Sequence, residues 1–131
     1  TGHLILSSIH TNNAAQTLDR IIDRFPAHQQ GQVRTQLAST LVAIVSQRLI
    51  PRVAGGLIPA VEVLIGTPAV RTLIREAKTY EIDLVIETSS DQGMVSLNRT
   101  LVDLVRRGEI TMDQAMDYSL NADEFRSLLA G

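Results

Sequence analysis

The 131-residue chain contains no cysteine and no tryptophan, and only two phenylalanines and two tyrosines. Without cysteine it forms no disulfide, no thiolate metal site and no cysteine nucleophile, which fits a reducing compartment. It offers no aromatic platform for stacking single-stranded bases, and its net charge of −2 argues against nucleic acid as the main partner. No apolar run is long enough to span a bilayer, and nothing resembles a signal peptide. The composition, 44% hydrophobic and 20% charged, is typical of a globular domain with a real core.

The beginning of the chain holds its most distinctive pattern. Residues 4–6 are continuously apolar, which predicts a strand covered on both faces, as in a parallel α/β sheet. The polar residues 10–13 can cap a following helix, and a strand, turn and helix N-terminus in that order form the place where α/β sheets bind anions. His3 and His10 flank this strand. On the residues alone, both histidines are equally well interpreted as ordinary polar residues at strand ends.

In the first half, apolar spacing predicts two helices and then two short strands around a glycine turn. These elements are expected over residues 14–25, 29–48, 49–52 and 57–65. Gln47 is a polar residue near the end of the second helix, and nothing else in its surroundings defines a role for it. Glu62 lies in the second strand among valine, leucine and isoleucine, so we expect it to face solvent at a sheet edge or to pair with a cation.

The second half is predicted to be helical from Gly66-Thr67-Pro68 onward, because Thr67 can cap a helix and Pro68 suits its first position. Residues 80–88 fit a strand and a helix equally well. Further helices are expected over residues 96–107, 112–120 and 122–130, with a capping box before the second of these. The chain is therefore expected to divide into an α/β part, residues 1–66, and an all-helical part, residues 67–131.

Two groups of charged residues allow more than one interpretation. Arg71 and Arg75 lie one turn apart on the helix after Pro68, where they form either a solvated basic face or a contact surface for an acidic or phosphate-bearing partner. The helix expected over residues 96–107, the Arg-Arg-Gly turn and the capped helix over residues 112–120 resemble a helix-turn-helix, but the second, reading helix would carry Asp113 and Asp117 and no basic residue. An acidic helix would be repelled by phosphates, so DNA reading is disfavoured.

Two segments resemble a known family. Residues 1–11 resemble the histidine box of the secretion and type IV pilus ATPases, with Ile9 in place of a leucine. Residues 69–76, AVRTLIRE, resemble the Ala-Ile-Arg-Asn-Leu-Ile-Arg-Glu motif of the PilT-like pilus retraction ATPases, with departures at Val70 and Thr72. The resemblance extends over nearly the whole chain and favours helix for residues 80–88.

The resemblance implies a fold class, a machine and a location. The fold would be α/β, the C-terminal part of a RecA-like P-loop core followed by a small all-helical region. The family forms cytoplasmic homohexamers, peripheral to the inner membrane at the pilus base, that hydrolyse ATP with Mg²⁺. They act on an inner-membrane platform protein to withdraw pilin. The assembly and type II secretion ATPases of the same superfamily are an alternative, as is a non-enzymatic helical interaction module.

The resemblance also implies residue roles. His10 would lie near the γ-phosphate as a catalytic residue, His3 would support it, and Gln47 would neighbour the nucleotide. Residues 69–76, called the retraction motif below, would couple hydrolysis to retraction; the roles are carried over to Ala69, Arg71, Leu73, Ile74, Arg75 and Glu76. The chain opens without methionine and lacks a G-x-x-x-x-G-K-[ST] loop. We therefore expect it to be part of a longer protein and to be unable to turn over ATP alone.

Overall fold

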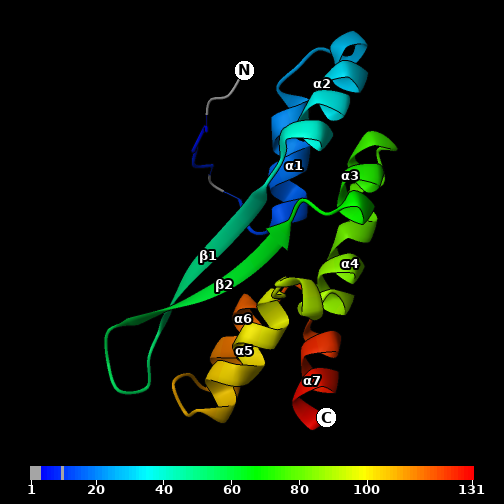
Figure 1. Ribbon diagram of the computed structural model, residues 1–131. Coiled ribbons are helices and arrows are strands. Elements are labelled where there is room, and N and C mark those ends of the chain that lie inside the picture. Colours follow the sequence, from blue (N-terminus) through cyan, green and yellow to red (C-terminus); the bar gives the residue numbers. More distant parts are fainter. Residues whose placement is uncertain (1–3, 10) are drawn as a thin grey trace.

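A long β-hairpin with helices packed on one face organises the chain in the computed structural model, which describes residues 4–9 and 11–131 (Figure 1). The hairpin consists of β1 (Ala43–Pro51) and β2 (Leu57–Ile65), paired antiparallel. The helices are α1 (Ala14–Asp23), α2 (Ala27–Thr40), α3 (Pro68–Arg75), α4 (Ile82–Thr88), α5 (Leu97–Arg106), α6 (Met112–Tyr118) and α7 (Ala122–Ala130). Two 3₁₀ turns, η1 (Thr79–Glu81) and η2 (Ser90–Gln92), flank α4. Among the described residues, no helix combines the length and apolarity that crossing a membrane requires.

The two faces of the hairpin differ. Its register pairs Ala43 with Ile65 and Pro51 with Leu57, and directly paired residues point to the same face. One face, which includes Ile50 and Leu64, is buried against the helices. The opposite face exposes apolar side chains, among them Val45, which is 64% exposed. The hairpin therefore has one covered and one open side.

Two hydrophobic cores lie at different positions along the hairpin, one at its open end and one nearer its middle (Figure 1). The first core joins α1 to α4 and the end of β2: Ala14, Leu18, Ala38, Leu64, Val70, Ile74, Ile82, Ile86 and Met94. The second core joins the middle of the hairpin to α5, α6 and α7: Ile50, Ala60, Leu97, Leu101, Val102, Leu104, Ile110, Ala115 and Phe125. Each core takes residues from both sides of Gly66. The expected division after residue 66 remains a prediction about domains and is not a boundary between these cores.

Most expected elements are confirmed together with their caps. Asn13 Oδ1 accepts the Gln16 N–H at 2.8 Å at the start of α1, and Pro68 occupies the first turn of α3. Thr111 and Gln114 form the expected capping box of α6, with bonds of 3.1 and 3.0 Å. The expectation for residues 80–88 is resolved as a 3₁₀ turn followed by helix α4. These starts depend on residues within one turn of each other, which explains why the sequence reveals them.

Two expected elements are wrong. Residues 4–6 form no strand, and the Leu6 side chain is 86% exposed. A buried strand needs neighbours on both sides, and the two strands of the described sheet pair with each other. The helix expected over residues 29–48 ends at Thr40, and residues 43–48 belong to β1. Pairing with β2 outweighs the helical spacing there, because Ile44 and Val45 are β-branched residues that suit a strand.

Candidate functional site

The strand-turn-helix pattern predicts an anion site at the N-terminus of α1, and this site remains a prediction. His3 and His10, the residues expected there, lie outside the described residues. The neighbouring Thr11 hydroxyl lies 2.5 Å from the Thr17 hydroxyl. The Ala14 N–H donates to Glu62 Oε1 at 2.8 Å, so one of the first amides of the helix already has a carboxylate partner within the chain.

Glu62 is therefore placed differently from the sequence-based expectation. It is buried, with 6% of its surface exposed, and it caps α1 from β2 instead of facing solvent or a cation. Burial raises the pKa of Glu62, and the nearby Asp83 carboxylate adds to the rise. Hydrogen bonds from the backbone N–H groups of Ala14 and Leu97 lower the pKa again and offset part of the effect of burial. No pattern in the sequence reveals this contact, because its partners lie far apart along the chain.

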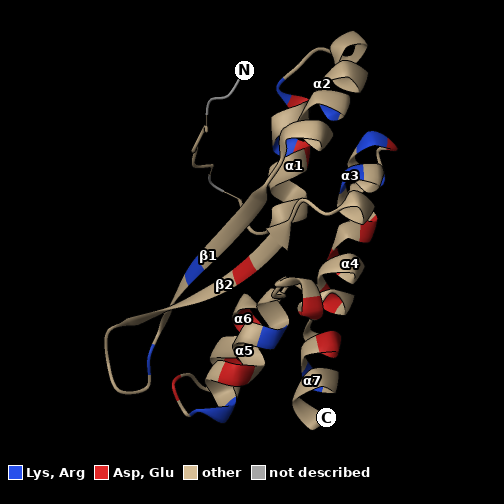
Figure 2. Cartoon of the chain, viewed as in Figure 1, with Lys and Arg blue, Asp and Glu red and all other residues tan. Residues whose placement is uncertain are grey.

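Acidic residues of β2, α4 and α7 come together where the two cores meet, and Figure 2 marks their positions on the ribbon. Glu62, Asp83 and Glu124 line one cavity together with asparagine and serine side chains. Burial is also the main cause that raises the pKa of Asp83 and of Glu124. Beside the cavity, Arg99 Nε lies 2.6 Å from Glu87 Oε1 and supplies a positive charge. Among the described residues, no group of three or more His, Cys, Asp and Glu side chains is arranged to hold a metal ion.

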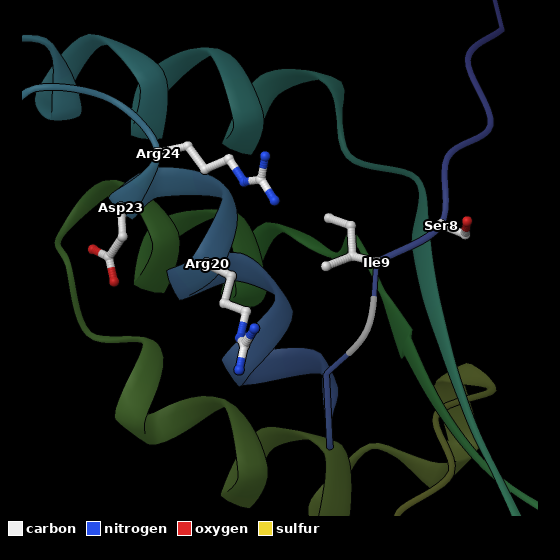
Figure 3. A pocket seen from close by; sticks show the side chains of 5 residues that line it. All are labelled: Ser8, Ile9, Arg20, Asp23 and Arg24. Carbon is white, nitrogen blue, oxygen red and sulfur yellow. The ribbon is translucent and has the colours of Figure 1, made fainter.

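A second cavity, of about 510 Å³, lies between α1 and the N-terminal segment. Ser8 and Ile9 form one wall, and Arg20, Asp23 and Arg24 form the other. Figure 3 shows the two guanidinium groups on the side of the N-terminal segment, with the Asp23 carboxylate turned away from them. Arg20 lies in the last turn of α1, and Arg24 follows as its C-cap.

Gln47 lies on the open face of the hairpin. It is on β1, directly across from Val61, and its side chain is exposed. The expectation of a helix end at this position is therefore wrong. The described residues contain no G-x-x-x-x-G-K-[ST] loop that could place a phosphate beside Gln47. That Gln47 neighbours a nucleotide remains a prediction.

The retraction motif forms α3 and divides into inward and outward residues. Val70 and Ile74 are fully buried in the first core, and Leu73 packs against it. Ala69, Arg75 and Glu76 are exposed. Half of the motif thus builds the interior and half remains available to a partner.

Arg71 does not belong to the solvated basic face that was one interpretation of this helix. Its Nε donates to the Gly66 carbonyl at 2.9 Å, and its two Nη atoms donate to the carbonyls of Ser39 at 2.9 Å and Leu41 at 3.2 Å. Arg75, one turn later, donates to the Thr72 hydroxyl of its own helix, at 3.2 Å. The two arginines of the motif therefore have different surroundings.

Comparison with known proteins places the chain among secretion and pilus ATPases. Residues 1–57 match the model of a family described as type II/IV secretion system protein. The chain is 40% identical over 125 residues to the type IV pilus retraction ATPase PilT of Pseudomonas aeruginosa, which covers 95% of this chain and 36% of that protein. It is 41% identical over 124 residues to a twitching motility protein of Neisseria gonorrhoeae, with 94% and 33% covered. The chain thus spans about a third of the length of these curated relatives.

A solved structure agrees with these matches. The crystal structure of the pilus retraction motor PilT with bound ADP superimposes with a TM-score of 0.86 at 40% identity, over 97% of this chain and 35% of that one. The expected fold class, the C-terminal part of an α/β ATPase core with a helical region, is thereby confirmed. By contrast, a type IV pilus assembly ATPase of Acinetobacter baylyi matches only 52 residues, or 40% of the chain.

Proposed function

This chain belongs to the PilT-like type IV pilus ATPases among the type II/IV secretion proteins, and on that premise we propose that its parent couples ATP hydrolysis to pilus retraction. The observation that carries the proposal is the extent of the matches. Relatives named for retraction or twitching align with 94–95% of the chain, whereas one named for pilus assembly aligns with 40%. The extent of the matches therefore favours retraction over assembly.

The proposal assigns different tasks to the two parts of the chain. Residues 1–66 would complete an ATPase core, with His10 at the γ-phosphate, His3 supporting it and Gln47 near the nucleotide. Residues 67–131 would form the helical region, in which the exposed retraction-motif residues transmit motion. The buried positions of Val70 and Ile74 support this assignment, since they fix the helix that presents Arg75 and Glu76.

The parent would act as a cytoplasmic homohexamer, peripheral to the inner membrane, that hydrolyses ATP with Mg²⁺ and acts on a pilus platform protein. The chain itself contains no G-x-x-x-x-G-K-[ST] loop. Phosphoryl transfer depends on positioning and charge stabilisation, so the chain alone would not turn over ATP.

A histidine substitution in the full-length parent tests the catalytic assignment. We expect His10→Ala to lower ATP turnover at least about tenfold, because it removes a group that positions or stabilises the transferring phosphoryl. His28→Ala is the matched control, since His28 is an exposed histidine of α2 and should leave turnover unchanged. Equal ATP turnover in His10→Ala and in the wild type would refute the catalytic role assigned to His10.

The reading frame upstream of Thr1 tests the proposed function as a whole. A phosphate-binding loop after a strand, followed by acidic clusters, would support a motor ATPase. If the upstream reading frame encodes no such loop, the chain would be part of a non-enzymatic interaction module, and His3 and His10 would have structural roles.

A further inference from the structure

Arg71 contacts three backbone carbonyls on two segments, the end of α2 and the residue after β2. Ser39 lies in the last turn of α2, Leu41 follows that helix, and Gly66 follows β2. The last carbonyls of a helix have no partner within it, so the Ser39 and Leu41 carbonyls are natural acceptors for a cation. Three of the five N–H donors of the guanidinium are used in these contacts.

Gly66 packs at the same point, backbone against backbone. Its N–H donates to the Val42 carbonyl at 2.8 Å. A Cβ atom at residue 66 would lie only 2.2 Å from the Leu41 carbonyl oxygen, so the segments could not approach this closely with any other residue. The junction between β2 and α3 is thus a tightly packed joint and not a loose linker, although its Gly-Thr-Pro sequence resembles one.

We propose that Arg71 is a positioning residue that locks α3 to the end of α2 and to the hairpin, so that the exposed side of the retraction motif moves with the ATPase core as one body. The proposal rests on the proposed function and deepens it. It divides the retraction motif by role: Arg71 holds the helix in place, and Arg75 and Glu76 remain exposed for a partner. Helix α3 can transmit a movement of the core to a partner only if it is held rigidly against the core. The three hydrogen bonds from Arg71 to backbone carbonyls hold it in this way.

The flat fork of arginine is essential to this geometry. Lysine keeps the positive charge, but its single side-chain nitrogen cannot hydrogen-bond at once to the Ser39, Leu41 and Gly66 carbonyls as the planar guanidinium does. Arg71→Lys therefore removes the set of three carbonyl contacts and keeps the positive charge. Arg106→Lys is a matched control, because Arg106 Nη2 also donates to two helix-end carbonyls, Leu128 at 3.3 Å and Leu129 at 3.0 Å, at a site away from α3.

The experiment compares these variants in the full-length parent by ATP turnover, by pilus retraction and by amide hydrogen exchange. For Arg71→Lys we expect turnover within about twofold of wild type and retraction lowered at least about tenfold. We also expect at least about tenfold faster exchange at the Gly66 amide and in α3, without a matching change in α5 to α7. Arg106→Lys should leave retraction unchanged. A role confined to stability would lower turnover and retraction in proportion, and that outcome would overturn the proposal.

A second variant disrupts the same joint at the backbone contact between Gly66 and Leu41. Gly66→Ala places a Cβ against Leu41, and we expect the same loss of retraction with turnover retained. Unchanged retraction in both Arg71→Lys and Gly66→Ala would also refute the proposal. If the wild-type parent hydrolyses no ATP, the proposed function fails, but hydrogen exchange still tests the joint: unchanged exchange at Gly66 in Arg71→Lys would show that Arg71 does not hold it.

Discussion

The two hydrophobic cores are held together by two kinds of contact, long-range and local. In the first core, polar contacts join residues far apart in sequence: Glu62 accepts from the Ala14 N–H, and the Thr79 hydroxyl donates to Asp19 Oδ1 at 2.7 Å. Around the second core, helix starts depend on neighbours, as where Asn121 Oδ1 accepts the Glu124 N–H at 3.1 Å.

Long-range contacts are present around the second core too, where the Thr100 hydroxyl donates to the Val61 carbonyl at 2.7 Å and the Ser119 hydroxyl donates to Asn98 Oδ1 at 2.6 Å. Both kinds of contact, local caps and long-range bonds, therefore occur in both cores, and they differ in how far apart their partners lie along the chain.

This difference has a consequence for how each core forms. Local caps cost little chain entropy to form, whereas contacts across 48 or 60 residues require the intervening chain to be ordered first. We infer that the helices of the second core keep their starts even when long-range contacts are weakened. The locally capped helices α1 and α3 of the first core should keep their starts as well, whereas the packing of α1 against β2 and η1 depends on its long-range contacts.

Removing the largest side chain of the second core should have the largest effect. Phe125 is fully buried, and Phe125→Ala should lower the free energy of unfolding by about 3–5 kcal/mol through lost burial and a cavity. Ile74→Ala in the first core is the counterpart, with an expected loss of about 2–5 kcal/mol. Hydrogen exchange should show the loss of protection concentrated in α5 to α7 for the first variant and in α1 to α4 for the second. Uniform loss throughout the chain in both variants would show that the two cores unfold as one.

The same contrast explains which parts of the fold could be predicted from the sequence. The starts of α3, α5 and α6 follow from Thr67, Ser96 and Thr111, each within one turn of the amide it caps. β2 was predicted with its observed bounds, because its apolar run is bordered by glycine on both sides. Local signals were sufficient in these places.

Prediction failed where distant residues decide the structure. Residues 43–48 have helical spacing but pair with β2, and residues 4–6 read as a buried strand although they have no strand partner in the described sheet. The surroundings of Glu62 and Arg71 depend on Ala14 and Ser39, which no local pattern links to them. Of the candidate site, the retraction motif was found by resemblance, and its split between inward and outward residues follows from its placement on α3.

The contact between Glu62 and α1 offers an intermediate test of the first core. Glu62→Ala leaves the Ala14 N–H without its partner and should cost about 1–3 kcal/mol. Glu62→Gln keeps an oxygen that can accept this bond but cannot ionise. Since the folded-state pKa of Glu62 is raised, its protonated form is favoured in the folded protein, and its share of stability is present below the unfolded value, near 4.5, and is lost as pH rises through the raised pKa.

Chemical denaturation at several pH values measures how much Glu62 contributes to the free energy of unfolding. Wild type should become less stable as pH rises above about 4.5, and Glu62→Gln should show a shallower decline. Asp117→Asn, which removes one carboxylate from an exposed position of α6, is the control and should keep the wild-type slope. A slope unchanged by Glu62→Gln would show that Glu62 ionises alike in the folded and unfolded states.

The smallest expected effect compares the two cores at equivalent helix ends. After α3 the Lys78 N–H donates to Leu73 O at 2.8 Å, and after α5 the Glu109 N–H donates to Leu104 O at 2.9 Å, so both helices end in the same turn. In each turn one residue has a left-handed backbone. After α5 it is Gly108, with φ of 74°, whereas after α3 it is Ala77, with φ of 59°.

Exchanging these two residues should therefore shift stability in opposite directions. Ala77→Gly relieves the strain and should raise the free energy of unfolding by about 0.5–1 kcal/mol, and Gly108→Ala should lower it by about 1 kcal/mol. Chemical denaturation of each variant against wild type measures both changes. A loss of stability in Ala77→Gly would mean that the entropy gained by the unfolded chain exceeds the strain relieved, and that the end of α3 is already as well fitted as the end of α5.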